Sequence, residues 1–84
     1  MHCVYVLQNL DPEEEFYLGC SADLRRRVAE HNSGLNNSTA GRKWRLAYYE
    51  AYVNKRAAMR RETSLKKNRR MKSLLLSRVR GSLQ

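Results

Sequence analysis

The chain has 84 residues, 42% of them hydrophobic, and its 17 Lys and Arg against 8 Asp and Glu give a formal net charge of +9. A chain of this length holds one small core, so we expect a single domain over residues 1–84. No apolar run is long enough to span a bilayer and no secretory leader is visible, which excludes a membrane-spanning protein and predicts a cytoplasmic location.

The chain begins with a predicted β-hairpin. Residues 3–7 (CVYVL) and 16–20 (FYLGC) are rich in apolar, β-branched and aromatic side chains, which favour strands. Residues 8–15 between them contain Asn, Asp and Pro, which favour a turn. The two strands are therefore expected to pair with each other.

A helix is predicted directly after the hairpin. Ser21 is a suitable N-cap, Asp23 would lie in the first turn, and the helix would end near Asn32. Arg27 and His31 are four residues apart, so they lie on the same side of this helix. The packed stripe of this helix consists of Leu24, Val28 and His31, and Arg27 borders it. An arginine in that position is unfavourable unless something anionic meets it.

The second half of the chain predicts a loop, a strand and two helices. Residues 33–43 are rich in Gly, Asn and Ser, and a loop of this length in a small domain is often a binding loop. Residues 44–53 predict a strand, and Asn54 is expected to cap a helix over residues 55–67. A further helix is indicated by the spacing of Met71, Leu74, Leu75 and Val79. The order β-β-α-β-α-α predicts an α+β fold in which helices flank a small three-stranded antiparallel sheet.

The positive charge is concentrated in this second half. Residues 1–42 contain four Arg or Lys and six Asp or Glu, whereas residues 43–84 contain thirteen and two. Such an uneven distribution of positive charge favours binding of a polyanion, and nucleic acid is the usual polyanion bound by proteins of this kind. Charge alone does not separate an enzyme from a ribosome-associated basic protein or a membrane-surface binder.

The hairpin reads CVY, then eleven residues, then YLG, and this resembles the GIY-YIG nuclease family. The resemblance continues in LRRRVAEHN and MRRETSLKK, which are similar to the family's arginine-bearing and glutamate-bearing helices. It covers nearly the whole chain, and the short length is similar to the small single-domain branch of the family. The first motif departs from the pattern, because Cys-Val stands where the family name has Gly-Ile.

The resemblance implies roles for individual residues. Tyr5 and Tyr17 match the motif tyrosines, and Gly19 matches the motif glycine, whose bare backbone would let a phosphate approach closely. The implied catalytic residues are Tyr5, Tyr17, Arg27, His31 and Glu62, and Glu62 is the implied metal ligand. Expected substrate-binding residues are Gly19, Arg60, Lys66 and Lys67. The family's late asparagine has no clear counterpart, since Asn68 follows Glu62 closely and Lys66 is the alternative.

The implied chemistry is metal-dependent hydrolysis of phosphodiester bonds in DNA, by an endonuclease-like enzyme. A single carboxylate suits one hard divalent ion, Mg²⁺ or Mn²⁺, and Glu62 would hold it. Arg27 would stabilise the phosphate as charge develops. Tyr5 is the favoured general base, with Tyr17 or His31 orienting the water or relaying the proton.

Two points stay open from the sequence. Glu62 is the one acid among nine basic residues from Lys55 to Lys72, so it is either a metal ligand or an ordinary ion-pair partner. The alternative function is a non-catalytic nucleic-acid-binding module that keeps the nuclease fold. The DNA could be duplex, branched or single-stranded, and RNA is not excluded as the partner.

Overall fold

The computed structural model describes residues 1–9, 15–33 and 43–83. Its elements are β1 (His2–Asn9), β2 (Phe16–Ser21), α1 (Leu24–Ser33), β3 (Trp44–Tyr52), α2 (Lys55–Lys67) and α3 (Arg69–Leu83). The strands form one antiparallel sheet in the order β2-β1-β3, so the first strand of the hairpin is central and β2 is an edge strand. The predicted α+β class and element order are confirmed.

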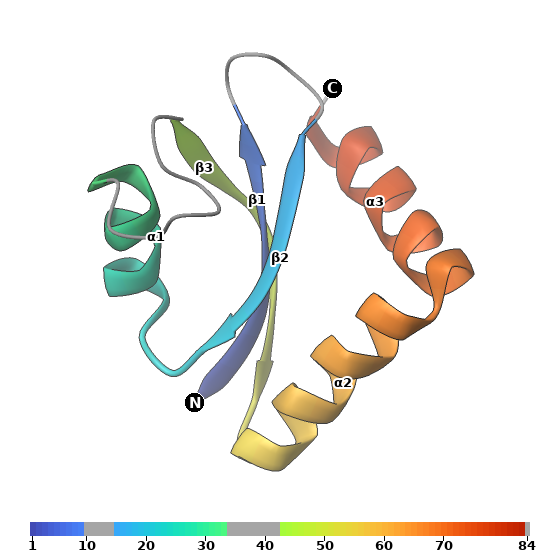
Figure 1. Ribbon diagram of the computed structural model, residues 1–84, viewed down its shortest axis with the longest axis horizontal. Coiled ribbons are helices and arrows are strands. Elements are labelled where there is room, and N and C mark those ends of the chain that lie inside the picture. The colour runs from blue at the N-terminus through green and yellow to red at the C-terminus, as the bar shows by residue number, and fades with distance from the viewer. Residues whose placement is uncertain (10–14, 34–42, 84) are drawn as a thin grey trace.

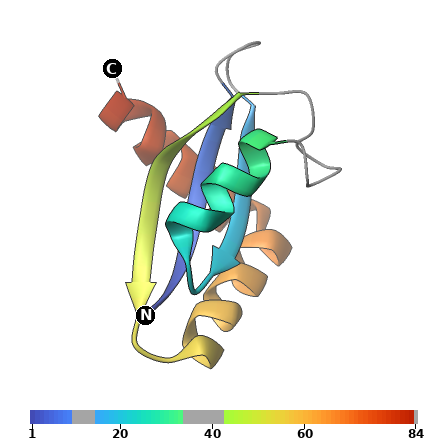
Figure 2. The same cartoon turned by 90° about the vertical axis from the view of Figure 1, so that its left-hand side faces the viewer.

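The sheet is covered on both faces. Figure 1 shows α1 on one side of the sheet and α2 and α3 on the other. Figure 2, turned by 90°, shows α1 in front of the strands with the other two helices behind them. The fold therefore has three layers, and residues of the central strand face both outer layers.

Each face of the sheet has its own core. Successive side chains of a strand point to opposite faces, so Tyr5 and Leu7 pack with Trp44 beneath α1. The larger core lies against α2 and α3 and contains Val4, Val6, Leu18, Ala58, Leu65, Leu75 and Val79. Burial of these apolar side chains is the main force that holds α2 and α3 on the sheet.

The helix caps explain where the helices begin and end. Asp23, rather than the predicted Ser21, caps α1, because its Oδ1 accepts a hydrogen bond from the Arg26 N–H at 3.1 Å. The predicted Asn54 cap of α2 is confirmed, with Oδ1 accepting from the Arg56 N–H at 2.7 Å. Asn68 separates α2 from α3, and its Oδ1 accepts from the Met71 N–H at 3.1 Å.

Some expectations from the pattern were wrong or lie outside the described residues. Leu74 shares the helical spacing of its buried neighbours, yet it is 63% exposed, because α3 packs through Leu75 and Val79 instead. Most of the predicted turn at 8–15 and of the predicted binding loop at 33–43 lies outside the described residues. Within the described part of the chain, no helix is long and apolar enough to cross a bilayer.

Candidate active site

A hydrogen bond between Tyr5 and His31 is the centre of the site. The Tyr5 hydroxyl lies 3.0 Å from His31 Nε2, and both residues are fully buried between β1 and α1. Burial raises the pKa of Tyr5 to about 12, while hydrogen bonding to Arg27 acts in the opposite direction. Burial, and then the charge of Arg27, lower the pKa of His31. At neutral pH both side chains are therefore uncharged, which suits a Tyr5 O–H that donates to an unprotonated Nε2.

Gly19 makes room for the Tyr5 hydroxyl. The two residues are opposite each other in the β1–β2 register. A Cβ on Gly19 would lie 2.5 Å from the Tyr5 hydroxyl oxygen and 2.6 Å from Cζ. Glycine is thus required at this position, because the Tyr5 side chain lies across the edge strand where a Cβ would otherwise be. Sequence reasoning connected Gly19 only with the approach of a phosphate.

Aromatic rings hold the imidazole in place. The Tyr17 ring centroid lies 4.6 Å from that of His31 and 6.3 Å from that of Trp44. The end of α1 is tied to β3 by two hydrogen bonds between Asn32 and the Trp44 backbone, at 2.9 and 2.6 Å. His31 therefore has little freedom to turn away from Tyr5.

Arg27 approaches this pair from α1. Hydrogen bonding to Tyr5, and then to Glu30, raises the pKa of Arg27. The Arg27 side chain is 40% exposed, and one end of its guanidinium lies 3.2 Å from Glu30 Oε1. Its Nε is buried and has no hydrogen-bond partner among the described residues. An anionic oxygen could therefore contact Arg27 only through the exposed part of its side chain.

Glu30 is a positioning residue that sequence reasoning missed. Its carboxylate contacts both Arg27 at 3.2 Å and Arg26 at 3.8 Å. Its spacing of three residues from Arg27 on a helix could have indicated the contact. Arg25 and Arg26 are exposed, as expected.

Glu62 lies on the other side of the sheet from the Tyr5–His31 pair. It lines a hollow of about 310 Å³ beside the end of β2, with His2, Cys20, Ser21, Ala22, Lys55 and Met59. Its side chain is 22% exposed, and Lys66 Nζ lies 3.2 Å from its Oε2. The charge of Glu62 contributes to the raised pKa of Tyr5, so the two groups interact electrostatically around the edge strand.

The match to known proteins is clear. Residues 1–74 match the family model described as the GIY-YIG catalytic domain. The chain belongs to the GIY-YIG family. The resemblance seen in the two tyrosine motifs is thereby confirmed, as is the prediction of a nuclease-type enzyme.

Relatives of this GIY-YIG chain include short and long proteins. It is 43% identical over 68 residues to a UPF0213 protein of Halobacterium salinarum, covering 79% of this chain and 86% of the relative. It is 38% identical over 78 residues to a UPF0213 protein of Clostridium perfringens, covering 90% of this chain and 82% of the relative.

A longer relative carries a more specific name. The structure-specific endonuclease subunit SLX1 homolog of Leishmania infantum is 38% identical over 69 residues. That alignment covers 73% of this chain but only 10% of the Leishmania protein. No solved structure matches the chain.

The residues around the GIY-YIG site suit a single weakly held metal ion. No group of three or more His, Cys, Asp or Glu side chains in the described ranges could form a metal cage. The half-buried Glu62 carboxylate is the available hard oxygen donor in its hollow. This donor set suits an ion that keeps several waters and takes its other ligands from substrate, as Mg²⁺ does.

The expected substrate contacts of α2 fall into two groups. Arg60 and Lys67 line a shallow groove on the outer surface of the helix. Lys66 lies on the Glu62 side, where it forms the ion pair. Asn68 is exposed at the junction with α3, where its side chain acts as a cap.

A second ion pair that the sequence did not reveal fixes α2 on the sheet. Arg61 Nε lies 3.0 Å from Glu50 Oε1, and its second contact to Oε2 is 3.3 Å. Both side chains are largely buried. This bidentate pair joins α2 to β3 one residue before Glu62 and so fixes this part of α2 on the sheet.

Proposed function

We propose that this chain is a metal-dependent endonuclease that hydrolyses phosphodiester bonds in DNA. The observation that carries the proposal is the partly exposed Arg27 side chain, which is 40% exposed, beside the buried Tyr5–His31 hydrogen bond. A guanidinium donor next to a proton-accepting pair suits a phosphate that is attacked by water. Membership of the GIY-YIG family and the printed name of the Leishmania relative support the same reaction.

Tyr5 and His31 form the proton relay. A phenol with a pKa of about 12 is a poor base by itself at neutral pH. In the relay, Tyr5 passes its own proton to His31 Nε2 while it accepts a proton from the attacking water. The hydroxide forms a bond to phosphorus, the scissile P–O bond breaks, and the leaving oxygen takes a proton from solvent. His31, uncharged beforehand, holds the transferred proton as imidazolium.

Arg27 and Glu62 act on the phosphate from opposite sides of the edge strand. Arg27 would donate to a non-bridging oxygen, and that contact strengthens as negative charge builds. Glu62 would hold one Mg²⁺ or Mn²⁺ ion, which supplies Lewis-acid stabilisation of the phosphate charge when bound. In this mechanism Tyr17 restrains the imidazole through ring contact.

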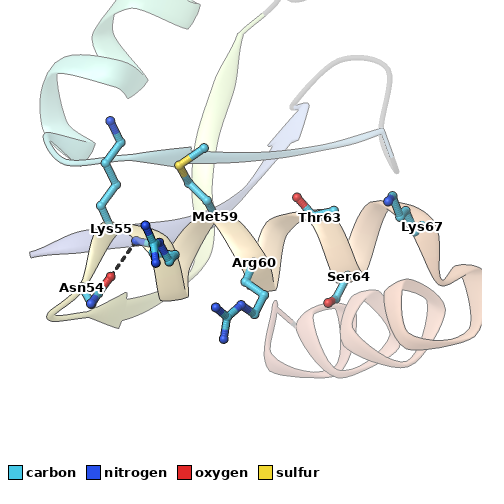
Figure 3. Close-up of a pocket in the computed structure, with 8 residues that line it drawn as sticks. Asn54, Lys55, Met59, Arg60, Thr63, Ser64 and Lys67 are labelled. Atoms are coloured by element: carbon cyan, nitrogen blue, oxygen red, sulfur yellow. Dashed lines mark hydrogen bonds between the residues drawn. The ribbon is translucent and has the colours of Figure 1, made fainter.

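The outer surface of α2 suits the phosphate backbone of the substrate. It carries an open groove of about 900 Å³ lined by four basic residues (Lys55, Arg56, Arg60 and Lys67) and by no acid among the described residues. In Figure 3, Lys55 and Met59 extend toward the sheet, whereas Arg60 extends from the opposite side of α2. Lys55 also lines the hollow of Glu62, so the groove and the site are continuous.

Cleavage assays with purified protein test the proposal. Labelled duplex, flap, four-way-junction and single-stranded DNA, together with an RNA strand, are incubated with Mg²⁺ or Mn²⁺, and EDTA serves as the negative control. We expect metal-dependent cuts on DNA, with one DNA structure cut more strongly than the others, in keeping with the words 'structure-specific endonuclease' in the name of the Leishmania relative. Tight binding without cleavage of any substrate would favour the alternative, a non-catalytic nucleic-acid-binding module.

Binding of DNA is expected to weaken steeply with salt. If six phosphates are contacted, affinity should fall by about 10³-fold between 50 and 200 mM salt, because the contacts release condensed counterions. The double variant Arg60→Glu/Lys67→Glu should reduce both the affinity and the salt dependence, as measured by fluorescence anisotropy. The control Arg25→Glu/Arg45→Glu changes the charge equally on α1 and β3, and a similar loss with this control would contradict the assignment to α2.

A methyl group at Gly19 is expected to disrupt the relay. In Gly19→Ala the new Cβ would lie only 2.5 Å from the Tyr5 hydroxyl oxygen, so the Tyr5 ring must shift and its hydrogen bond to His31 is disturbed. We expect Gly19→Ala to lower kcat about as much as Tyr5→Phe, roughly 10²-fold or more. The double variant should be no slower than either single variant, because both remove the same group. Additive losses would show that Gly19 acts on the phosphate independently of Tyr5.

A further inference from the structure

A second basic hollow lies along α3. It has a volume of about 700 Å³ and is lined by Lys66, Arg69, Lys72, Ser73, Leu76 and Arg80. Of these described residues four are basic and none is acidic. Residues 69, 72, 73, 76 and 80 recur with helical spacing, so they form one side of α3.

This α3 hollow begins at the Glu62 carboxylate. Lys66 lines the hollow and also forms the 3.2 Å ion pair with Glu62. At the other end, the Arg80 guanidinium lies 5.3 Å from the centroid of the Phe16 ring, at the start of β2. Stacking on an aromatic ring restrains the direction of an arginine side chain. The basic side of α3 is thus continuous with the reaction site and restrained at its far end.

The surface beside α1 has the opposite character. A hollow of about 520 Å³ between α1 and β3 is lined by Leu24, Arg25, Val28, Leu46 and Tyr49. Apolar and aromatic side chains dominate it, and the one basic residue among those described is Arg25. A polyanionic strand leaving the site would therefore be attracted toward the α3 hollow more than toward this apolar hollow.

We propose that the α3 hollow binds the sugar-phosphate backbone of the substrate on one side of the scissile phosphate, while the groove on α2 binds it on the other side. This inference rests on the proposed function, because it takes the Glu62 site as the point of cleavage. From Arg69 to Arg80 the helix rises about 16 Å. That distance corresponds to roughly five nucleotides of a B-form strand. The footprint is thus expected to extend about five nucleotides from the cut on the α3 side.

Binding measurements with neutralised α3 variants test the inference. Arg69→Gln/Lys72→Gln removes two positive charges from the hollow, and Arg70→Gln/Arg78→Gln removes two from other sides of the same helix. Kd is measured for a DNA strand at several salt concentrations, in a Glu62→Gln background so that no cleavage interferes. The hollow variant should bind roughly 30-fold more weakly at 100 mM salt, with a log–log salt slope reduced by roughly 1.4 to 1.8. The control pair should lose about threefold or less, because its charges act only through screened long-range attraction.

Shortened substrates test whether the α3 hollow binds the strand on only one side of the cut. After the cut has been mapped with the unmodified protein, the strand is truncated to two nucleotides beyond the cut on one side or on the other. Truncation on one side should abolish the difference in Kd between the hollow variant and the parent, and truncation on the other side should preserve that difference. Equal losses in the hollow and control pairs, or a difference that survives both truncations, would overturn the inference. If the unmodified protein cuts nothing, the nuclease proposal fails, while the comparison of salt slopes still decides whether α3 binds the strand.

Discussion

Replacing Glu62 with glutamine is expected to abolish cleavage while the protein still folds and binds DNA. Glu62 is the only acid from residue 51 to the C-terminus, so no neighbouring carboxylate in that segment can take over a metal ion. Loss of a metal ligand removes several kcal/mol of transition-state stabilisation, which lowers the rate by roughly 10³-fold or more. Glutamine is nearly isosteric, and the substitution removes one negative charge near the bound phosphate, so affinity for DNA should be kept or increased.

A matched variant separates the metal role of Glu62 from its ion pair. Lys66→Gln breaks the same 3.2 Å contact but leaves the carboxylate in place. If Glu62 served only as an ion-pair partner, both variants would lose about 1 kcal/mol of stability or less and would keep their activity. We expect Lys66→Gln to cleave at saturating DNA and Glu62→Gln not to cleave at any Mg²⁺ concentration. Single-turnover rates and thermal melting curves give the two readouts, and full activity in folded Glu62→Gln would end the proposed mechanism.

Arg27→Ala is expected to reduce the cleavage rate by roughly 10²- to 10³-fold, the usual cost of removing one donor to a developing oxyanion. Its effect on Kd should be much smaller, because the contact strengthens only as charge develops on the phosphate. The effect should therefore appear in kcat more than in KM.

Arg26→Ala is the control for that variant. Arg26 also contacts Glu30, at 3.8 Å, but it is exposed and is not among the groups that perturb Tyr5. Removing it disturbs the same carboxylate without touching the Tyr5–His31 pair. Equal rate losses from the two substitutions would mean that Glu30, and not the guanidinium of Arg27, is the group that matters.

The sequence predicted the parts of this fold that depend on local patterns. The apolar, β-branched and aromatic residues of the hairpin predicted paired strands, and the spacing of Arg27 and His31 predicted that both lie on the same side of α1. The Tyr5–His31 hydrogen bond joins residues 26 positions apart, so no local pattern could predict it. The same holds for the pair Arg61–Glu50, which depends on how α2 lies across β3.

Other differences arise from competition between similar groups. Ser21 and Asp23 are both good N-caps. Because α1 begins at Leu24, Asp23 is the residue whose side chain reaches the N–H of Arg26 in the first turn. Leu74 and Leu75 are adjacent and equally apolar, and the angle at which α3 meets the sheet decided which one is buried. Glu62 lies at helical spacing between the buried Ala58 and Leu65, and its own side chain is 22% exposed. Its role as a metal ligand stays a prediction.

The central position of β1 has a consequence for changes in chain length. Tyr5 faces α1 while its neighbours Val4 and Val6 face α2 and α3. Deleting or inserting one residue within the strand would reverse the parity of every side chain beyond that point. The motif tyrosine would then exchange places with a valine, and each core would receive residues shaped for the other. Residues added to lengthen this protein should therefore lie outside β1. A single residue inserted within β1 would disrupt both the packing of the two cores and the Tyr5–His31 hydrogen bond.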